Sequence, residues 1–478
     1  MKNKMKYFSL SILVMAVAIL TGCEKEPVTN GNIKIYTTTV KMAGSHNKAL
    51  TENGVKTFAV DEQIAVIYKN IYGTTVKAVS APLTAGDIIG NGKVATFSVE
   101  ITDPDKSEVV SYIYPAAMAN DDGTPNYAAL SSQDGTLATL ASNLDFCQKE
   151  SDWNVDGSLP TNIQLDNMLS ICKFTINDFT SNVTKLTIKN GSNIYTVTPT
   201  SSLSEIWVAL KPIANGDITV YAARGKDLYT KTVTEKTLAA NNLYPINVTT
   251  TRVEGAISGL FRIGDDLVYF SKGNLQATYD GNSWNWAFAA NQYNYIGNAP
   301  GNTLITSSSP WISDNGTVDL FGWSTSNTYY GINNSDNGYQ YEGSFEDWSS
   351  NVSGSWHTPA KSEMIEIFNN HTHGKTTVMS VPGLVILPYR TSVTSIELSY
   401  DASAWATMEA NGAVFLPFAG YRIGTGVSYF SSGSGHYWTS TPNNVTSAHG
   451  FYSDGGNVEY GSGGREVGCS VRLIGTDN

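Results

Sequence analysis

The sequence predicts an all-β N-terminal half followed by an α+β C-terminal half. Between about residues 30 and 248 the chain is rich in Thr and Val, in short runs that alternate apolar and polar residues, as half-buried strands do. The composition changes sharply near residue 255, and eight of the ten tryptophans lie beyond that point. The clearest helical stripe also lies there, at residues 359–368. We therefore expect the two halves to fold as separate domains.

The first residues indicate export. A segment with three lysines precedes a short apolar run at residues 8–20, which predicts a signal peptide over residues 1–22. The sequence "LTGC", which ends at Cys23, resembles a bacterial lipobox. That resemblance implies that Cys23 becomes the first mature residue and carries a lipid that anchors the protein to a membrane. A plain signal peptide with a coincidental Cys is the alternative.

Charge and cysteine content restrict the partners. The net charge is −12, and residues 255–478 carry 8 basic and 18 acidic groups, a net charge of −10. Such an acidic half argues against nucleic acid as a ligand and suits carbohydrate or protein contact. The remaining thiols, Cys147, Cys172 and Cys469, form no dense disulfide framework and match no zinc spacing. A Cys147–Cys172 bridge stays open.

The N-terminal half is predicted to contain two successive β-sandwiches, over residues 23–165 and 166–252, which divide near Pro160. The run "ATFSVEI" places residues 95, 97, 99 and 101 on one apolar face. Asn190-Gly191, between two β-prone runs, predicts a hairpin. The runs "DITVYAA" and "LYPINVTT" continue the strand pattern, and a weak helical segment lies near residues 127–140.

Three stretches of this half resemble the fimbrillin superfamily of Bacteroidetes, the pilin-like lipoproteins: "TFAVDEQIAVIY" (57–68), "SYIYPAA" (111–117) and "LPTNIQLDNMLSICKFTI" (159–176). The resemblance implies two transthyretin-like sandwiches and association with other pilin subunits by strand addition, after a protease cuts behind a basic residue. The first arginine of the chain is Arg224, so an Arg-specific protease would find no site near the N-terminus. This favours a subunit that keeps its lipid.

The C-terminal half, residues 255–478, has an ordered series of motifs. "FRIGDDLVYFSKGNLQ", "WNWAFAANQYNYIGN" and "VDLFGWSTS" come first. A helix is then predicted with Thr358 as N-cap, Pro359 at its first position, and an apolar stripe at residues 360, 364, 367 and 368. "GLVILPYR", "ANGAVFLPFAGYR", "GHYWTSTP" and "REVGCSVRLIG" follow.

This order resembles the Bacteroides and Fibrobacter surface-protein modules of the C-type-lectin-like fold, related to the formylglycine-generating-enzyme type. The resemblance implies an α+β domain that binds a receptor through residues between "AGYR" and "SVRL". Tyrosines beside Gly/Ser-rich turns offer rigid rings for contact, and Ser, Asn and His offer adaptable polar groups. The candidate ligand-binding residues are Tyr429, Ser431, Ser432, Ser434, His436, Asn443, Asn444, Tyr452 and Tyr460. The tryptophans at 323, 356 and 438 are interpreted as core.

The sequence does not favour an enzyme. The formylglycine-generating relatives use paired cysteines, and this half has only Cys469, interpreted as a buried strand thiol. His371 and His373 could hold a metal, but the preferred interpretation is two solvated histidines just past a helix. No metal and no cofactor are predicted, although structural Ca²⁺ in the loops at 313–316 and 333–338 stays open.

These observations predict a cell-surface adhesion lipoprotein that is anchored in the outer membrane by its lipid, part of a fimbrium, or both. Its partners would be other pilin subunits, the membrane through the Cys23 lipid, and a glycan or protein on a host or bacterial surface, but not nucleic acid. The role would be that of a pilus tip, an accessory subunit or a stand-alone binder. The alternatives are a non-adhesive structural or anchor pilin and an enzyme on the formylglycine-generating-type fold.

Overall fold

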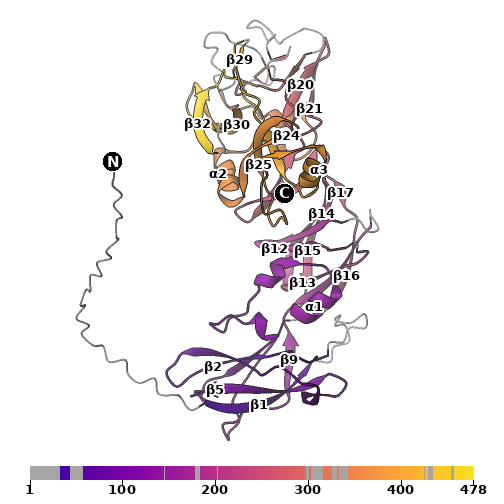
Figure 1. Ribbon diagram of the computed structural model, residues 1–478, viewed down its shortest axis with the longest axis vertical. Coiled ribbons are helices and arrows are strands. Elements are labelled where there is room, and N and C mark those ends of the chain that lie inside the picture. Colours follow the sequence, from indigo (N-terminus) through magenta and orange to yellow (C-terminus); the bar gives the residue numbers. More distant parts are fainter. Residues whose placement is uncertain are drawn as a thin grey trace, which may run out of the picture.

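The computed structural model describes residues 33–42, 57–144, 146–177, 183–201, 203–297, 301–302, 316–325, 331–332, 343–424, 426–428, 434–453 and 457–477. Their regular secondary structure is mostly strand, and they form three units stacked along the long axis of the molecule (Figure 1). The first unit lies at the bottom of that view, the second in the middle and the third at the top. No helix in the described ranges has the length and apolar character needed to cross a membrane.

The first unit is one continuous sheet that curls around its own core. Its strand order is β3-β2-β6-β8-β9-β1-β5-β4, so it differs from the two separate sheets that a sandwich implies. Phe97 of β5 and Tyr114 of β6 both pack edge-on against Phe58, at ring distances of 5.6 and 5.3 Å. The residues predicted to share a face, Ala95, Phe97, Val99 and Ile101, are all buried. The strands are β1 Ile33–Met42, β2 Ala65–Lys69, β3 Thr75–Val79, β4 Ile88–Ile89, β5 Val94–Thr102, β6 Val110–Tyr114, β8 Cys147–Ser151 and β9 Ile163–Asn167, with short 3₁₀ turns at Ala85–Asp87 and Ala116–Met118.

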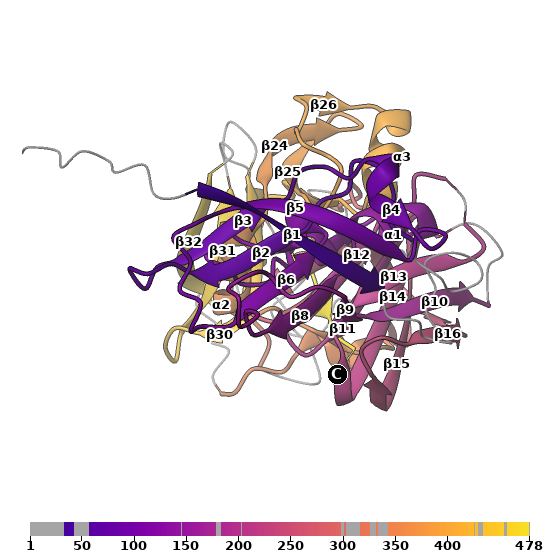
Figure 2. The same cartoon turned by 90° about the horizontal axis from the view of Figure 1, so that it is seen from below.

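Strand β1 lies inside this sheet. It pairs antiparallel with β5 from Ile33 to Lys41 and parallel with β9 from Val40 to Met42. Figure 2, seen from below, shows β1 crossing the unit beside β5. Thr38 and Val40 are buried, whereas Ile33 and Ile35 are exposed. The Thr38 hydroxyl donates to the Pro160 carbonyl at 2.8 Å, so β1 is bonded to its own chain on both sides.

The second unit is a sandwich of two sheets, with strand orders β13-β10-β16 and β17-β15-β14-β11-β12-β7. The predicted hairpin is confirmed, because Asn190 of β11 faces Asn193 of β12 and Gly191 adopts a positive φ of 53°. Strand β7 comes from the chain before residue 165 but pairs with β12 of this unit. The elements are β7 Ser132–Gln133, α1 Leu137–Asn143, β10 Ser170–Ile176, β11 Lys185–Asn190, β12 Asn193–Val197, β13 Ile206–Leu210, β14 Ile213–Arg224, β15 Asp227–Leu238, β16 Leu243–Val248 and β17 Thr251–Arg252, with a 3₁₀ turn at Ala128–Ser131.

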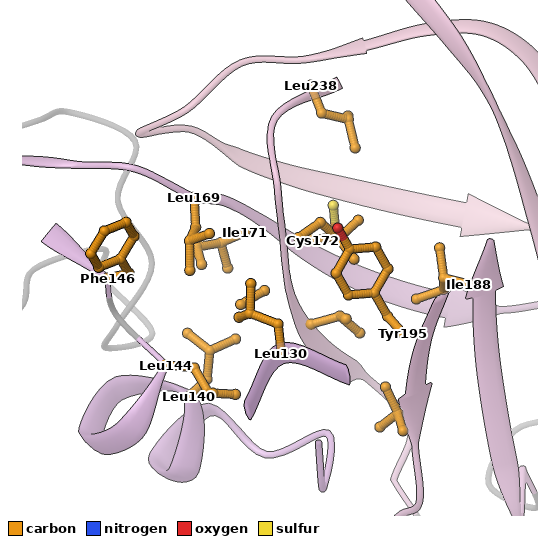
Figure 3. Close-up of a cluster of buried hydrophobic side chains, with 14 of the residues drawn as sticks. Leu130, Leu140, Leu144, Phe146, Leu169, Ile171, Cys172, Ile188, Tyr195 and Leu238 are labelled. Atoms are coloured by element: carbon orange, nitrogen blue, oxygen red, sulfur yellow. The ribbon is translucent and has the colours of Figure 1, made fainter. Parts of the chain in front are cut away.

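The core of the second unit continues into the first. Figure 3 shows Leu140 of α1 and Leu144 just after it pointing toward Leu169 and Ile171. The same apolar cluster includes Ala65, Ile67 and Ile113 of the first unit. Cys147 and Cys172 are both buried and no disulfide joins them, so the bridge that the sequence left open is not formed.

The third unit is α+β, and its described residues form several small sheets and two helices. Helix α2 buries the predicted stripe at Met364, Ile367 and Phe368. The predicted N-cap is wrong: α2 begins at Lys361, and the Thr358 hydroxyl donates instead to Asp347 at 2.8 Å. The strands are β18 Ala256–Ile263, β19 Asp266–Ser271, β20 Leu275–Tyr279, β21 Trp284–Phe288, β22 Thr317–Val318, β23 Trp356–His357, β24 His373–Val378, β25 Val381–Ile386, β26 Ser399–Tyr400, β27 Val414–Pro417, β28 Tyr421–Ile423, β29 Gly426–Ser428, β30 Gly435–Pro442, β31 Ser447–Ser453, β32 Val458–Gly464 and β33 Ile474–Gly475. The helices are α2 Lys361–Asn370 and α3 Ala402–Ala410, and Trp348–Asn351 forms a 3₁₀ turn.

Apolar packing and polar bonds join the third unit to the second. Tyr221 and Leu228 of the second unit belong to the same apolar cluster as Tyr269 of β19. The Lys185 ammonium donates to the carbonyls of Tyr389 and Arg390 at 2.7 and 2.9 Å. The second and third units therefore share a packed joint.

Candidate functional site

The candidate site lies on the three-stranded sheet β30-β31-β32 of the third unit. In its register, His436 faces Tyr452 and Trp438 faces Gly450. Gly450 in turn faces Gly461, and Tyr452 faces Glu459. Because side chains alternate along a strand, these residues occupy one face of the sheet.

The opposite face belongs to the core. Tyr437 and Phe451 stack there at 5.2 Å, and Phe451 meets Phe368 of α2 at 5.3 Å. This packing against α2 holds the sheet in place. The face with His436 and Tyr452 can therefore contain a pocket, because the core contacts of the sheet are made on its other face.

That face holds a pocket of about 240 Å³. Its lining consists of aromatic rings, glycines and a few other residues: Tyr421, His436, Tyr437, Trp438, Gly450, Phe451, Tyr452, Gly461, Ser462, Gly463, Val467 and Cys469. Most of the lining surface is apolar. Small-molecule sites have this character, with an apolar lining and a few polar groups that orient the ligand.

Aromatic side chains form the wall of the pocket. His436 and Tyr452 stack across the strands, with ring centres 5.5 Å apart and planes inclined by 14°. Tyr421 meets His436 edge-on at 4.9 Å. The Trp438 ring is buried, and its Nε1 donates to the Phe321 carbonyl at 2.8 Å. The rings therefore hold one another in place.

Glycines form the floor. A Cβ added at Gly461 would lie 3.4 Å from the Tyr452 ring, and one at Gly463 would lie 3.4 Å from the Trp438 ring. Both positions have room for a side chain, and that side chain would occupy the pocket. Gly450 is different, because a Cβ there would come within 2.7 Å of the Tyr437 carbonyl. The pocket thus exists because Gly461 and Gly463, which lie on the same face of β32, lack side chains.

The polar groups at the mouth of the pocket include an exposed carboxylate, whereas the thiol inside it is buried and neutral. The Tyr452 hydroxyl donates to the carboxylate of Glu459, which is exposed. Inside, burial raises the pKa of the Cys469 thiol, an effect opposed by the Arg422 charge. Cys469 is therefore a neutral thiol, which is a poor nucleophile.

The structure divides the predicted site residues. His436 and Tyr452 lie together in the pocket. Asn443 and Asn444 lie at the other end of the β30–β31 hairpin, where the Asn443 side chain donates to Ser447 Oγ at 2.8 Å. Tyr460 lies on the opposite face, against Phe368.

Ser434, another predicted site residue, does not line the pocket. Ser434 is buried, just before β30. Cys23, Tyr429, Ser431 and Ser432 lie outside the described residues.

Residues that the sequence prediction missed complete the site. Tyr421, Gly461 and Gly463 line the pocket, as does Trp438, which was interpreted as core alone. The glycines of "YGSGG" at residues 460–464 were the available signal, because alternate glycines in a strand leave one face bare. Trp323 and Trp356 are buried core residues, as predicted.

The histidines after α2 are structural. His371 is buried rather than solvated, so that interpretation is wrong. Its Nε2 accepts from the Arg262 backbone N–H at 3.0 Å, and its Nδ1 donates to the Leu387 carbonyl at 3.1 Å. In the described part of the chain, no three His, Cys, Asp or Glu side chains come together as a metal site.

Comparison with known proteins gives only distant structural similarities. No family model and no curated protein matches the chain. A fimbrial assembly protein from Parabacteroides distasonis is 9% identical, covers 50% of this chain and 95% of its own, and has a TM-score of 0.27. The tip fimbrial protein Mfa3 from Porphyromonas gingivalis is 10% identical, covers 46% and 95%, and has a TM-score of 0.23. GBS52, a minor pilin from Streptococcus agalactiae, is 9% identical, covers 46% and 96%, and has a TM-score of 0.19.

Proposed function

We propose that this chain is a cell-surface adhesion lipoprotein, a pilus tip or accessory pilin whose third unit binds a glycan or protein ligand. One observation carries the proposal: the apolar pocket lies in the third unit. The second unit separates this third unit from strand β1, where the described chain begins (Figure 1). A stack of β units between an N-terminal anchor and a distal pocket suits a protein that presents a binding site away from a surface. The domains would be residues 23–165, 166–252 and 255–478, with Cys23 carrying the lipid.

The fold assignments are part of this proposal. The first two units would be fimbrillin-like, and the third would be C-type-lectin-like. Support comes from the β sheets of the first two units, the α+β character of the third, and the sequence motifs that each contains.

Adhesion is tested by removing one wall of the pocket. Cells that display Tyr452→Ala should adhere with about tenfold lower apparent affinity, which corresponds to ~1.4 kcal/mol. The physical reason is loss of the ring that stacks on His436. Adhesion is measured by counting bound cells against the density of the target surface.

The matched control is Tyr72→Ala, which removes an exposed tyrosine from the first unit. It should leave adhesion unchanged. If both variants adhered like the wild type, adhesion would not depend on the pocket, and the observation that carries the proposal would be contradicted.

Assembly with other pilin subunits through strand addition is the second part of the proposal. Strand β1 supports it, because removal of β1 would leave β5 and β9 each with an open edge. Mass spectrometry of the surface-exposed protein tests this part. An N-terminus behind a lysine between residues 41 and 56 would support strand exchange, whereas a lipid-modified N-terminal Cys23 would indicate a subunit that keeps its anchor.

A further inference from the structure

We infer that the pocket of the β30-β31-β32 sheet binds one neutral pyranose unit of a glycan. This inference rests on the proposed function and narrows it, since the proposal itself leaves the ligand as a glycan or a protein. Four features of the pocket carry it.

The first feature is shape. Gly450, Gly461 and Gly463 leave a bare patch of backbone, and the rings of Tyr421, His436, Trp438 and Tyr452 border it. A bare patch beside aromatic rings accepts a ring-shaped group that presents C–H surface. A volume of about 240 Å³ suits one such ring with a substituent.

The second feature is the absence of charge in the lining. No Asp, Glu, Lys or Arg lines the pocket among the described residues. A charged group that entered would lose hydration without gaining an opposite charge, which is strongly unfavourable. The inserted group is therefore neutral.

The third feature is the rim. Glu459 is exposed, and its carboxylate is oriented by the bond from the Tyr452 hydroxyl. A carboxylate only accepts hydrogen bonds, so it favours a ligand that carries several donors around its edge. A pyranose offers hydroxyl donors at its edge and C–H groups on its faces. An apolar side chain of a protein ligand offers a C–H surface but no hydroxyl donors, so it would leave the Glu459 carboxylate without a ligand bond.

The fourth feature is the charge of the whole unit. Residues 255–478 carry a net charge of −10. This field disfavours sialic acids, uronic acids and sulfated sugars, and it does so most strongly at low salt. Neutral hexoses, N-acetylhexosamines and 6-deoxyhexoses are the sugars that remain.

The test fills the pocket and leaves the rest of the chain intact. In Gly461→Ile, the new side chain enters the pocket beside Tyr452. The matched control is Gly374→Ile, a strand glycine on β24 of the same unit, where a Cβ would make ordinary contact with Ile396 at 3.5 Å. The full-length wild type and both variants are screened against neutral and acidic oligosaccharides and against deglycosylated surface proteins. Thermal unfolding confirms that each variant is folded.

The expected result is binding of neutral oligosaccharides by wild type and Gly374→Ile, and at least tenfold weaker binding by Gly461→Ile. Binding of the sugar should also change the fluorescence of Trp438 at the pocket wall. Tyr452→Phe gives a second readout if Gly461→Ile does not fold. Loss of the rim hydroxyl should weaken binding several-fold, whereas Tyr460→Phe on the opposite face should not.

Four results would overturn the inference. Binding of acidic sugars alone, or of a deglycosylated protein blocked by Gly461→Ile, would overturn the neutral pyranose and leave the adhesion proposal standing. Equal sugar binding by wild type and Gly461→Ile would place the sugar elsewhere. A wild type that binds no sugar and no protein, on cells that do not adhere, would overturn both the inference and the proposed function.

Discussion

At the scale of single residues, His371 shows how one buried side chain ties segments together. It satisfies a backbone donor at Arg262 and a backbone acceptor at Leu387, so only the neutral ring fits both bonds. Burial lowers the pKa of His371, and the bond from its Nδ1 to the Leu387 carbonyl opposes that effect in part.

The sign of the resulting pH dependence follows from this lowered pKa. The unfolded chain binds the His371 proton more readily than the folded chain, so folding stability falls as the pH drops below about 6.5. We expect the wild type to lose more thermal stability between pH 7 and pH 5 than His371→Gln does. The comparison is made by thermal unfolding of both chains across that range.

The difference between the two chains isolates His371. Burial raises the pKa of Asp319 to about 6, so the folded chain binds the Asp319 proton more readily than the unfolded chain does. Asp319 therefore makes folding more favourable as the pH drops from 7 to 5, which is opposite to the effect of His371. Asp319 is present in both chains, so its contribution cancels. Parallel curves for wild type and His371→Gln would contradict the prediction.

At the scale of elements, the two helices of the third unit begin in different ways. Helix α3 has Asp401 as its N-cap, and the Asp401 carboxylate accepts from the Ala404 N–H at 2.8 Å. The N-cap of α2 is Ala360, whose methyl group accepts no hydrogen bond. Glu363 compensates only in part, because its carboxylate accepts from the Ala360 N–H at 2.6 Å and also faces His357.

This contrast predicts opposite effects of two cap substitutions. Ala360→Ser should stabilise the protein by about 1 kcal/mol, because serine supplies the missing acceptor. Asp401→Ala should destabilise it by a similar ~1 kcal/mol. Urea unfolding of the two variants measures both changes, and a neutral Ala360→Ser would mean that the end of α2 is already satisfied.

At the scale of the whole molecule, the joint between the second and third units has a polar centre. The Asp477 carboxylate, after the last strand, accepts from Thr230 Oγ1 at 2.8 Å, and the hydroxyls of Tyr221 and Tyr269 lie close to it. Burial raises the pKa of Asp477, and the three hydroxyls oppose that effect. The bonds from Lys185 to the carbonyls of Tyr389 and Arg390 are a further polar contact of this joint.

Weakening this joint should make the second and third units unfold independently rather than in one transition. The double variant Lys185→Met with Asp477→Ala removes the bonds to the partly buried or exposed carbonyls of Tyr389 and Arg390 and the part-buried bond from Thr230, at about 0.5–1.5 kcal/mol for each lost bond. Calorimetry should then show the third unit unfolding in a transition of its own. Lys69→Met, which breaks an exposed ion pair with Glu108, is the control and should change stability by less than about 1 kcal/mol.

The sequence predicted local elements better than their pairing. Alternation identified the buried face of β5, and Asn190-Gly191 located a hairpin, because both signals lie within a few residues. The continuous sheet of the first unit and the place of β7 depend on partners that are distant in the chain. The site was only partly predicted, because it too depends on strand pairing between distant residues. Tyr452 and Tyr460 look alike in the sequence, but the register of β31 and β32 pairs Tyr460 with Phe451 and so turns it toward the core.

The glycine floor has a consequence for how this protein can change over evolutionary time. A single-nucleotide change converts a glycine codon to alanine, serine or valine. At Gly461 and Gly463 such changes would add volume inside the pocket with little disturbance of the backbone, whereas at Gly450 they would collide with the Tyr437 carbonyl. Substitutions at Gly461 and Gly463 can therefore change the ligand preference in small steps, whereas Gly450 must stay glycine to keep the sheet intact. Lineages under pressure to recognise new surfaces should vary first at residues 461 and 463.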